Sequence, residues 1–254
     1  MNAYIEEQLR RVAVMLEQAE FAEALAELRQ LEPYTADDGR AWQLRGFAHF
    51  GLGDRRRATS AFESAALLVP LSSTAQLRLA QLYLQRRRRE SAQAIYLHLA
   101  GCESLPEPEV ELVAGGLAAV GAFDEALRFC LAQLDRFDGN HKLSYAAAIA
   151  MRRLGRDDAE ILNFLQRAHR LQPGDVSYRI ALARCLLTEN HRSEATRVLD
   201  GVDLEATQCI PSLERMRMLF ERLDDSERVE QCRARLQAIA LRVSSGYRPM
   251  KNEF

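Results

Sequence analysis

Two dense runs of arginine carry the most concentrated charge in the chain. The first is Arg55-Arg56-Arg57 and the second is Arg86-Arg87-Arg88-Arg89. Guanidinium groups bind carboxylates and phosphates, so these runs could meet an acidic protein tail, nucleic acid or an anionic lipid surface. They could equally be solvated turns that nearby carboxylates such as Glu63 and Glu90 neutralise. Nucleic acid is the least favoured partner, because no aromatic residues alternate with the arginines and the formal net charge is −2.

No arrangement of residues for catalysis or metal binding is recognisable. The chain lacks a GxxxxGK[ST] phosphate loop, a GxSxG nucleophile turn, a GxGxxG following a strand and an HExxH helix. His98 and Cys102 have the spacing of two ligands on one helix, but two ligands do not make a zinc site. We therefore expect no enzymatic activity, no metal and no cofactor.

The cysteines and the apolar segments of the chain indicate in which cellular compartment it resides. The cysteines are scattered, odd in number and free of CxxC pairs: Cys102, Cys130, Cys185, Cys209 and Cys232. This pattern is typical of a reduced chain in which several cysteines are buried as small apolar groups. The N-terminal residues lack the basic stretch of a signal peptide, and the longest weakly apolar run, 112–123, is too short to span a membrane. We expect a cytoplasmic location and no transmembrane segment.

A repeat of 34 residues, with a single step of 35, organises the chain. One series of small or slim residues consists of Ala24, Ala58, Ala92, Ala126, Ile161, Ala195 and Val229. A second series precedes it by twelve residues, or by thirteen at one step, and consists of Val12, Gly46, Ala80, Ala114, Ala148 and Ala183. Two helices approach most closely where both side chains are small. The two series therefore predict where the helices of each hairpin cross, for example Gly46 against Ala58.

Glycine-aspartate turns and prolines divide the period into hairpins. The expected hairpins are 3–38, 39–72, 73–106, 107–140, 141–174, 175–209 and 210–243, followed by a tail, 244–254. The seventh hairpin departs from the pattern, because Arg217 replaces the small residue and Arg233 replaces an aromatic one. We expect this degraded hairpin to be the polar cap that the end of a repeat stack requires.

The spacing of these residues resembles the signature of the tetratricopeptide repeat family. The residues that carry the resemblance are Trp42, Gly46, Gly53, Ala58, Phe62, Ala65 and Pro70, and it continues at Tyr83, Ala92, Tyr96, Gly121, Asp124, Glu125 and Ala126. It covers roughly residues 3–242. The resemblance implies an all-α, right-handed superhelical solenoid of about seven helix hairpins. It also implies a non-enzymatic scaffold that binds a protein or peptide in a concave groove lined by the first helix of each hairpin.

Mapping that groove onto this chain gives the candidate site. Its inner positions are Arg40, Gln43, Phe47, Phe50, Leu77, Arg78, Gln81, Leu84, Tyr145, Ile149, Arg152 and Arg184. We expect an apolar floor edged by arginine and glutamine, which suits an amphipathic helix or an extended peptide with apolar anchors. Phe50 and Leu84 could instead belong to the core between helices.

Relatives that bind chaperone tails use a clamp of lysine and asparagine for the terminal carboxylate. The corresponding positions here hold Leu9, Ala13, Gln43, Phe47, Leu77 and Gln81. We therefore expect no clamp of the Hsp70/Hsp90 type.

Gly115-Gly116 interrupts the first helix of the fourth hairpin, at a cost of about 1–2 kcal/mol relative to alanine. The pair could admit the backbone of a ligand, permit flexing between hairpins, or allow tight helix packing.

The sequence leaves the role of the whole protein open, and the candidates are an adaptor, a co-chaperone and an assembly factor. The alternatives are a self-associating structural protein and, by family analogy alone, a chaperone for secretion or pilus subunits.

Overall fold

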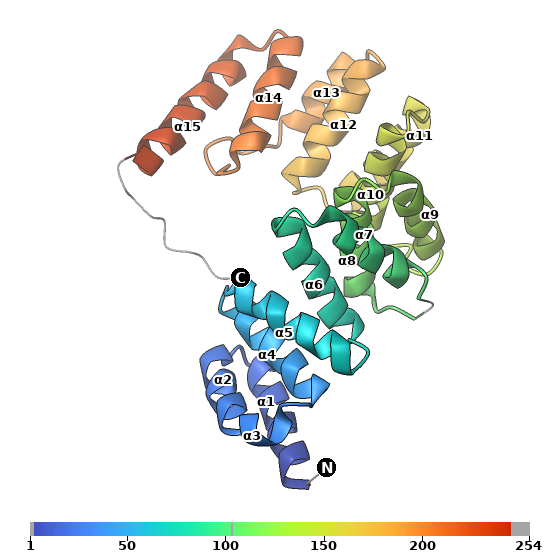
Figure 1. The fold of residues 1–254 in the computed structure, drawn as a ribbon. Coiled ribbons are helices and arrows are strands. Elements are labelled where there is room, and N and C mark those ends of the chain that lie inside the picture. The colour runs from blue at the N-terminus through green and yellow to red at the C-terminus, as the bar shows by residue number, and fades with distance from the viewer. Residues whose placement is uncertain (1–2, 103, 245–254) are drawn as a thin grey trace. The chain divides into compact units, whose positions relative to one another are not determined.

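The structure is a computed structural model that describes residues 3–102 and 104–244 (Figure 1). In this part of the chain all regular elements are helices. In the first half they are α1 (Ala3–Glu17), α2 (Phe21–Gln30), α3 (Glu32–Thr35), α4 (Gly39–Gly51), α5 (Arg55–Leu68), α6 (Ser73–Gln85), α7 (Arg89–Ala100) and α8 (Glu107–Ala119). They continue as α9 (Phe123–Leu134), α10 (His141–Arg153), α11 (Asp158–Leu171), α12 (Val176–Thr188), α13 (Arg192–Leu199), α14 (Ile210–Arg222) and α15 (Ser226–Ser244). The predicted all-α class is confirmed.

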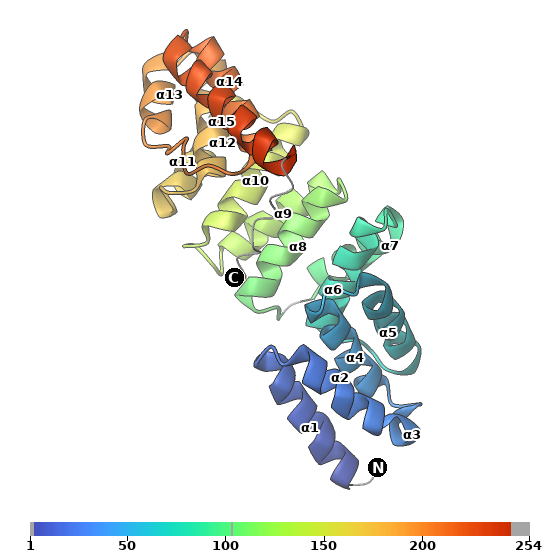
Figure 2. The same ribbon diagram turned by 90° about the vertical axis from the view of Figure 1, so that its left-hand side faces the viewer.

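The helices pair into seven hairpins, each with a first and a second helix: α1–α2, α4–α5, α6–α7, α8–α9, α10–α11, α12–α13 and α14–α15. The chain divides within α9 into two compact units, residues 1–129 and 130–254. In the first unit, successive hairpins stack side by side, and α4 contacts α6 while α6 contacts α8 (Figures 1 and 2). In the second unit, α12 contacts α14 in the same way. The predicted tail lies outside the described residues apart from Ser244, which ends α15.

All seven hairpins turn in the same way. The middle of each turn holds one residue in the left-handed conformation, with φ between 60° and 75°: Ala19, Gly53, Arg87, Gly121, Gly155, Asn190 and Asp224. The next residue donates its backbone N–H to the carbonyl five residues earlier, as Asp54 does to His49 at 2.9 Å and Arg88 to Tyr83 at 2.8 Å. This is the Schellman motif, which satisfies the free carbonyls at the end of the first helix. The repeat is therefore visible in the backbone even where no glycine marks it.

The two series of small residues are buried, and they show where the helices of a hairpin meet. Gly46 is buried in α4, and Ala58 and Phe62 of α5 are both fully buried. A Cβ atom added at Gly46 would come within 2.5 Å of Cδ1 of Phe62. The nearest part of α5 is thus the Phe62 ring, one helical turn beyond Ala58. The missing side chain at Gly46 makes room for this aromatic ring, and the crossing of Gly46 at Ala58 itself stays a prediction.

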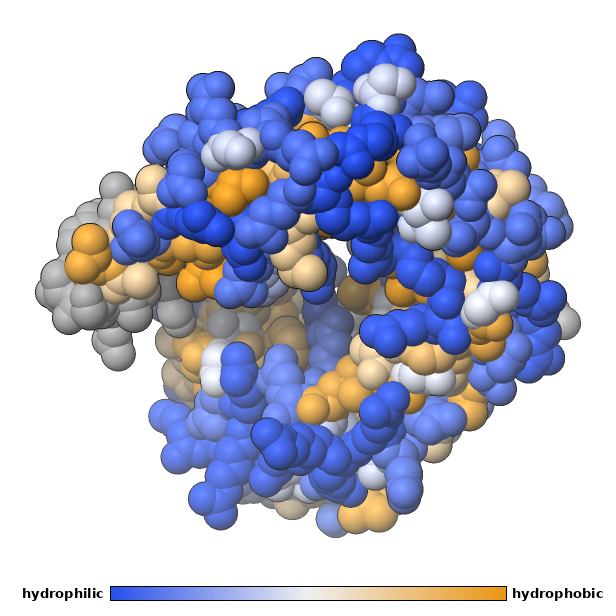
Figure 3. Space-filling view, turned by 90° about the horizontal axis from the view of Figure 1, so that it is seen from above, coloured by the Kyte–Doolittle hydropathy of each residue, from blue (hydrophilic) through white to orange (hydrophobic). Residues whose placement is uncertain are grey.

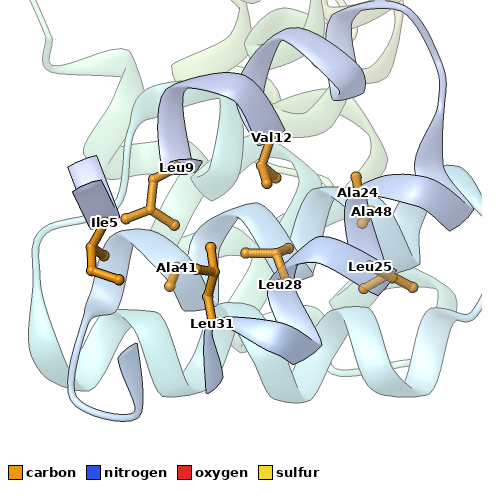
Figure 4. Packing of buried hydrophobic residues seen from close by; sticks show 9 residues of the cluster. All are labelled: Ile5, Leu9, Val12, Ala24, Leu25, Leu28, Leu31, Ala41 and Ala48. Carbon is orange, nitrogen blue, oxygen red and sulfur yellow. The ribbon is translucent and has the colours of Figure 1, made fainter. Parts of the chain in front are cut away.

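Apolar residues from successive hairpins share one core. In the first unit, Ile5, Leu9 and Val12 of α1 lie against a set from α2 and its C-terminal end, and Ala41 and Ala48 of α4 complete the cluster (Figure 4). The set from α2 consists of Ala24, Leu25, Leu28 and Leu31. Since one hairpin alone cannot bury its apolar face, the neighbour supplies the cover.

The seventh hairpin carries charge at two positions that are apolar or small in the second hairpin. Arg217 and Arg233 occupy the positions that Gly46 and Phe62 hold in the second hairpin. Both reach Oε1 of Glu221, at 2.5 Å and 3.5 Å, and Arg233 also pairs with Glu230 at 2.5 Å. That this hairpin caps the repeat stack stays a prediction.

Candidate peptide-binding surface

Five of the predicted groove residues lie on the neighbouring helices α4 and α6. Phe47, Phe50, Arg78, Gln81 and Leu84, here called the α4–α6 patch, are all partly exposed. Phe47 meets the buried Phe62 ring edge-on, with centroids 5.2 Å apart. The Arg78 guanidinium carbon lies 5.0 Å from the Phe50 ring centroid, and Nη1 of Arg78 donates to Oε1 of Gln81 at 3.2 Å. The patch thus combines apolar surface with a guanidinium group held in place on an aromatic ring.

Leu77 does not belong to this surface. Its side chain is only 1% exposed. The prediction that Leu77 lines the groove is wrong. Leu77 belongs to the buried core instead.

Arg40 is exposed but already engaged. Its Nη1 and Nη2 donate to both carboxylate oxygens of Glu6 at 3.1 Å and 2.9 Å, and its Nε and Nη2 donate to Asp38. The hydrogen bond from Arg40 lowers the pKa of Glu6. Burial by itself would raise the pKa of Asp38, but the hydrogen bonds from the Arg40 side chain and backbone lower it. Arg40 therefore links the second hairpin to the first. Its guanidinium charge is balanced by Glu6 and Asp38, so a partner protein is not needed to explain the presence of an arginine here.

Gln43 also has a structural contact. Its Oε1 accepts a hydrogen bond from the backbone N–H of Ser72 at 3.0 Å, and Ser72 is the N-cap of α6. The side chain therefore fixes the start of the next first helix relative to α4.

In the second unit the predicted residues lie on α10 and α12. Tyr145 and Ile149 are partly exposed, and the Tyr145 ring packs on that of Tyr178, with centroids 4.7 Å apart. The Tyr178 hydroxyl is 2.8 Å from Nδ1 of His141. Arg184 is exposed, whereas Arg152 is partly buried. Tyr178, which packs on Tyr145, was not among the residues predicted from the sequence.

The arginines of the two turns are all exposed, but three have structural contacts. Arg57 pairs with Asp54 at 3.3 Å, and Arg89 donates from Nε to the carbonyl of Val120 at 2.8 Å. Arg88 pairs with Glu63 at 2.6 Å and lies 4.2 Å above the Tyr83 ring. The other four, Arg55, Arg56, Arg86 and Arg87, extend from the turns into solvent. Whether they bind an anionic partner stays a prediction.

The two glycines of α8 have different surroundings. A Cβ atom added at Gly116 would collide with the Tyr96 ring of α7. At Gly115 the same atom would meet nothing within 4 Å. Tight helix packing therefore explains Gly116, while Gly115 leaves open space on an exposed face of the helix.

Two clefts are lined by residues other than those of the α4–α6 patch, although the first includes Arg40, which was predicted to line the groove. One, of about 550 Å³, is lined by Glu6, Tyr34, Asp38, Arg40 and Val69 among others, and its Tyr34 is 74% exposed. The other, of about 610 Å³ in the second unit, is lined mainly by acidic residues around Arg228. Neither cleft was predicted as such, because each depends on how loops outside the repeat pattern fold.

Exposed apolar side chains form small separate patches on the face of the molecule that Figure 3 shows.

The described residues contain no cluster of three or more histidine, cysteine or acidic side chains arranged to hold a metal ion. All five cysteines are free. Among the helices within residues 3–244, none is both long and apolar enough to cross a bilayer.

Comparison with solved structures identifies the fold. A tetratricopeptide repeat protein from Parabacteroides merdae matches with a TM-score of 0.69 at 13% identity, and the match covers 92% of each chain. Pseudomonas aeruginosa pilF matches with a TM-score of 0.59 at 18% identity, over 82% of this chain and 91% of that one. YrrB, described as a repeat protein of this type with an unusual peptide-binding site, matches with a TM-score of 0.60 at 16% identity, over 72% and 90%. No family model and no curated protein matches the sequence.

Proposed function

We propose that this chain, which has the tetratricopeptide repeat fold, is a non-enzymatic scaffold that binds a segment of a partner protein. The observation that carries the proposal is the α4–α6 patch. Phe47, Phe50 and Leu84 expose part of their apolar surface on adjacent first helices, and Arg78 is positioned above Phe50. Support also comes from YrrB, a structural neighbour for which a peptide-binding site is described.

The patch suits a segment with apolar anchors. Each square ångström of apolar surface that such a segment removed from water would contribute roughly 25 cal/mol. The Arg78 guanidinium, already oriented by Phe50 and Gln81, would donate hydrogen bonds to carbonyl or carboxylate oxygens of the segment. Because these side chains are held before binding, little conformational entropy is lost on association.

The test is a double substitution that makes the patch acidic without touching the core. A peptide that binds the wild-type chain, selected from a displayed random library, serves as the probe in fluorescence anisotropy. Phe50→Glu with Leu84→Glu is expected to raise the Kd for this peptide at least about tenfold. Circular dichroism should show the same helix content, since both positions are partly exposed.

A matched control separates the patch from a general effect of two added charges. Leu67→Glu with Leu97→Glu changes exposed leucines on the second helices α5 and α7, which are 87% and 38% exposed. This variant should bind the peptide like the wild type. Equal affinity of the patch variant and the control would refute the proposed surface.

Self-association is the second candidate, and exposed apolar residues in the terminal hairpins favour it. Tyr4 and Val14 of α1 are 61% and 49% exposed, and Met218 and Leu241 in the last hairpin are 57% and 68% exposed. Analytical ultracentrifugation over a wide concentration range tests this function, and a monomer at all concentrations would argue against it.

A chaperone for pilus or secretion subunits would use the same α4–α6 patch, with an apolar subunit as the partner.

A further inference from the structure

Seven arginines lie at one edge of the first unit, at the turns of the second and third hairpins. Near the start of α4, Gln43 bonds the backbone of Ser72, which is the N-cap of α6, and the two helices contact each other. They therefore run side by side in the same direction, and the turns after their C-terminal ends belong to one edge. This arginine edge consists of Arg55, Arg56, Arg57, Arg86, Arg87, Arg88 and Arg89. Glu20 and Asp124 lie at the turns of the hairpins on either side, so the positive charge is confined to these two turns.

Few carboxylates accompany the arginine edge. The two turns themselves contain only Asp54 and Glu90. Asp54 caps α5 and pairs with Arg57 at 3.3 Å. Glu63, farther along α5, pairs with Arg88 at 2.6 Å. Glu90 forms no ion pair in the part of the chain that the structure describes. The nearby carboxylates thus engage two of the seven arginines.

Four arginines of the edge keep exposed guanidinium groups. The side chains of Arg55, Arg56, Arg86 and Arg87 form no hydrogen bond or ion pair among the described residues. They stand on two separate hairpins, and neither of the two clefts described above includes any of them. They therefore present an array of charges rather than one pocket. Such an array is complementary to a surface that carries many anions.

The backbone at Arg87 adds a second observation. This residue has a φ of 60°, in the left-handed region that side chains other than those of asparagine and aspartate rarely adopt. The equivalent positions Gly53, Gly121 and Gly155 are glycine, which adopts it without steric cost. An arginine here strains the turn, and its guanidinium returns no contact within the described chain. Contact with an external anion would offset that strain.

An apolar side chain completes the edge. Leu52, the C-cap of α4, is 51% exposed and directly precedes Gly53 of the turn. Neither turn contains an aromatic residue on which a nucleic-acid base could stack. Guanidinium groups bind phosphates, and an exposed leucine beside them can enter the interfacial layer of a bilayer. This combination favours an anionic lipid surface over nucleic acid.

We propose that the arginine edge docks the first unit on a membrane surface that carries anionic phospholipids. The guanidinium groups of Arg55, Arg56, Arg86 and Arg87 bind headgroup phosphates, and Leu52 enters the interfacial layer. This activity is separate from binding at the α4–α6 patch, because it uses turn residues and none of that patch. Each basic residue near an anionic bilayer strengthens binding by about fivefold.

The experiment measures co-sedimentation of the full chain with lipid vesicles. Vesicles of phosphatidylcholine and phosphatidylserine are compared with vesicles of phosphatidylcholine alone. The wild type is expected to bind the phosphatidylserine vesicles at least about tenfold more tightly at low ionic strength, and to lose most of this binding at high salt. A quadruple variant should bind them at least about a hundredfold more weakly than the wild type. It carries Arg55→Gln, Arg56→Gln, Arg86→Gln and Arg87→Gln.

Two single substitutions separate docking from folding. Arg87→Gly should weaken vesicle binding about fivefold although it relieves the strained turn, so a loss of stability cannot explain the effect. Leu52→Ser should also weaken binding, but the dependence on salt should stay the same because no charge changes. Unchanged binding by Arg87→Gly would overturn the proposal.

A control variant removes four positive charges from exposed helix positions of the second unit. Its substitutions are Arg170→Gln, Arg184→Gln, Arg197→Gln and Arg215→Gln. This control should bind the vesicles like the wild type, and an equal loss in both quadruple variants would mean that only net charge matters. That result would overturn the proposal, as would equal binding of the two kinds of vesicle or no binding of either.

Two other polyanions test the alternative partners. Polyglutamate and a single-stranded oligonucleotide are each titrated against the wild type under the same conditions, and both should bind more weakly than the phosphatidylserine vesicles. Tighter binding of either one, abolished in the quadruple variant of the arginine edge, would overturn the proposal in favour of an acidic protein or of nucleic acid.

Discussion

The Tyr96 ring of α7 lies directly against Gly116 of α8, in the space that the side chain of any other residue would occupy. Tyr96 is 2% exposed and its ring cannot swing into solvent. The contact joins the second helix of one hairpin to the first helix of the next. It explains why a residue with poor helix propensity stands in the middle of α8.

The two adjacent glycines give a matched pair of substitutions. Gly116→Ala is expected to lower the free energy of unfolding by about 1–3 kcal/mol, because the added methyl group overpacks the contact with Tyr96. Gly115→Ala should raise it by about 1 kcal/mol, because alanine favours the helix and its Cβ atom enters open space. Urea denaturation followed by circular dichroism measures both. Equal effects of the two substitutions would contradict the assigned contact.

The turn between α6 and α7 carries backbone strain at Arg87. This residue has a φ of 60°, whereas the equivalent positions in three other turns are glycine. Arg87→Gly is expected to stabilise the chain by about 0.5–1 kcal/mol, because glycine adopts this conformation without steric cost. Arg86→Gly is the control, since Arg86 has a φ of −94° and gains nothing from glycine. The control should be neutral or destabilising in the same urea titration.

The contacts of Arg40 predict a dependence on pH. The folded-state pKa values of Glu6 and Asp38 lie below their ordinary values of 4.5 and 3.8. Their stabilising contribution is therefore present above those ordinary values and is lost as the pH falls through the lower folded-state values. Arg40→Ala should have a lower Tm than the wild type at neutral pH, and the difference should vanish in acid. A Tm difference that persists in acid would show that Arg40 acts through packing rather than charge.

Arg152 and Arg228 should respond differently to the loss of their charge. Arg228 pairs with Asp225 at 2.5 Å and with Asp200 at 2.7 Å, so Arg228→Gln is expected to destabilise the chain by about 1–2 kcal/mol. Arg152→Gln should leave the free energy of unfolding unchanged or raise it, because the buried guanidinium loses no partner. Thermal unfolding of both variants measures the contrast. Strong destabilisation by Arg152→Gln would assign that residue a structural role.

Periodicity made the hairpins predictable. Residues such as Ala24, Ala58 and Ala92 recur at one interval because each marks a close approach of helices, and all three are fully buried. Arg217 and Arg233 interrupt that pattern in the seventh hairpin, and both pair with Glu221. These features depend on contacts within a repeat unit of nearly constant length, so they can be predicted from residue types at fixed spacing.

Exposure within the groove was less predictable. Leu77 and Leu84 lie two helical turns apart on α6, yet the first is buried and the second is partly exposed. The difference depends on how the side chains of the neighbouring helices α4, α5, α7 and α8 cover each part of α6. Similarly, Arg40 was mapped as a groove residue from its position alone, but the bond to Glu6 engages its guanidinium.

The residues themselves determined the helical repeat and its seven hairpins, because regular spacing of small side chains admits few other packings. Tertiary structure alone decided which inward side chains stay accessible and which arginines have partners. Both properties arise from side chains on different helices, and their distances depend on how each pair of neighbouring hairpins packs.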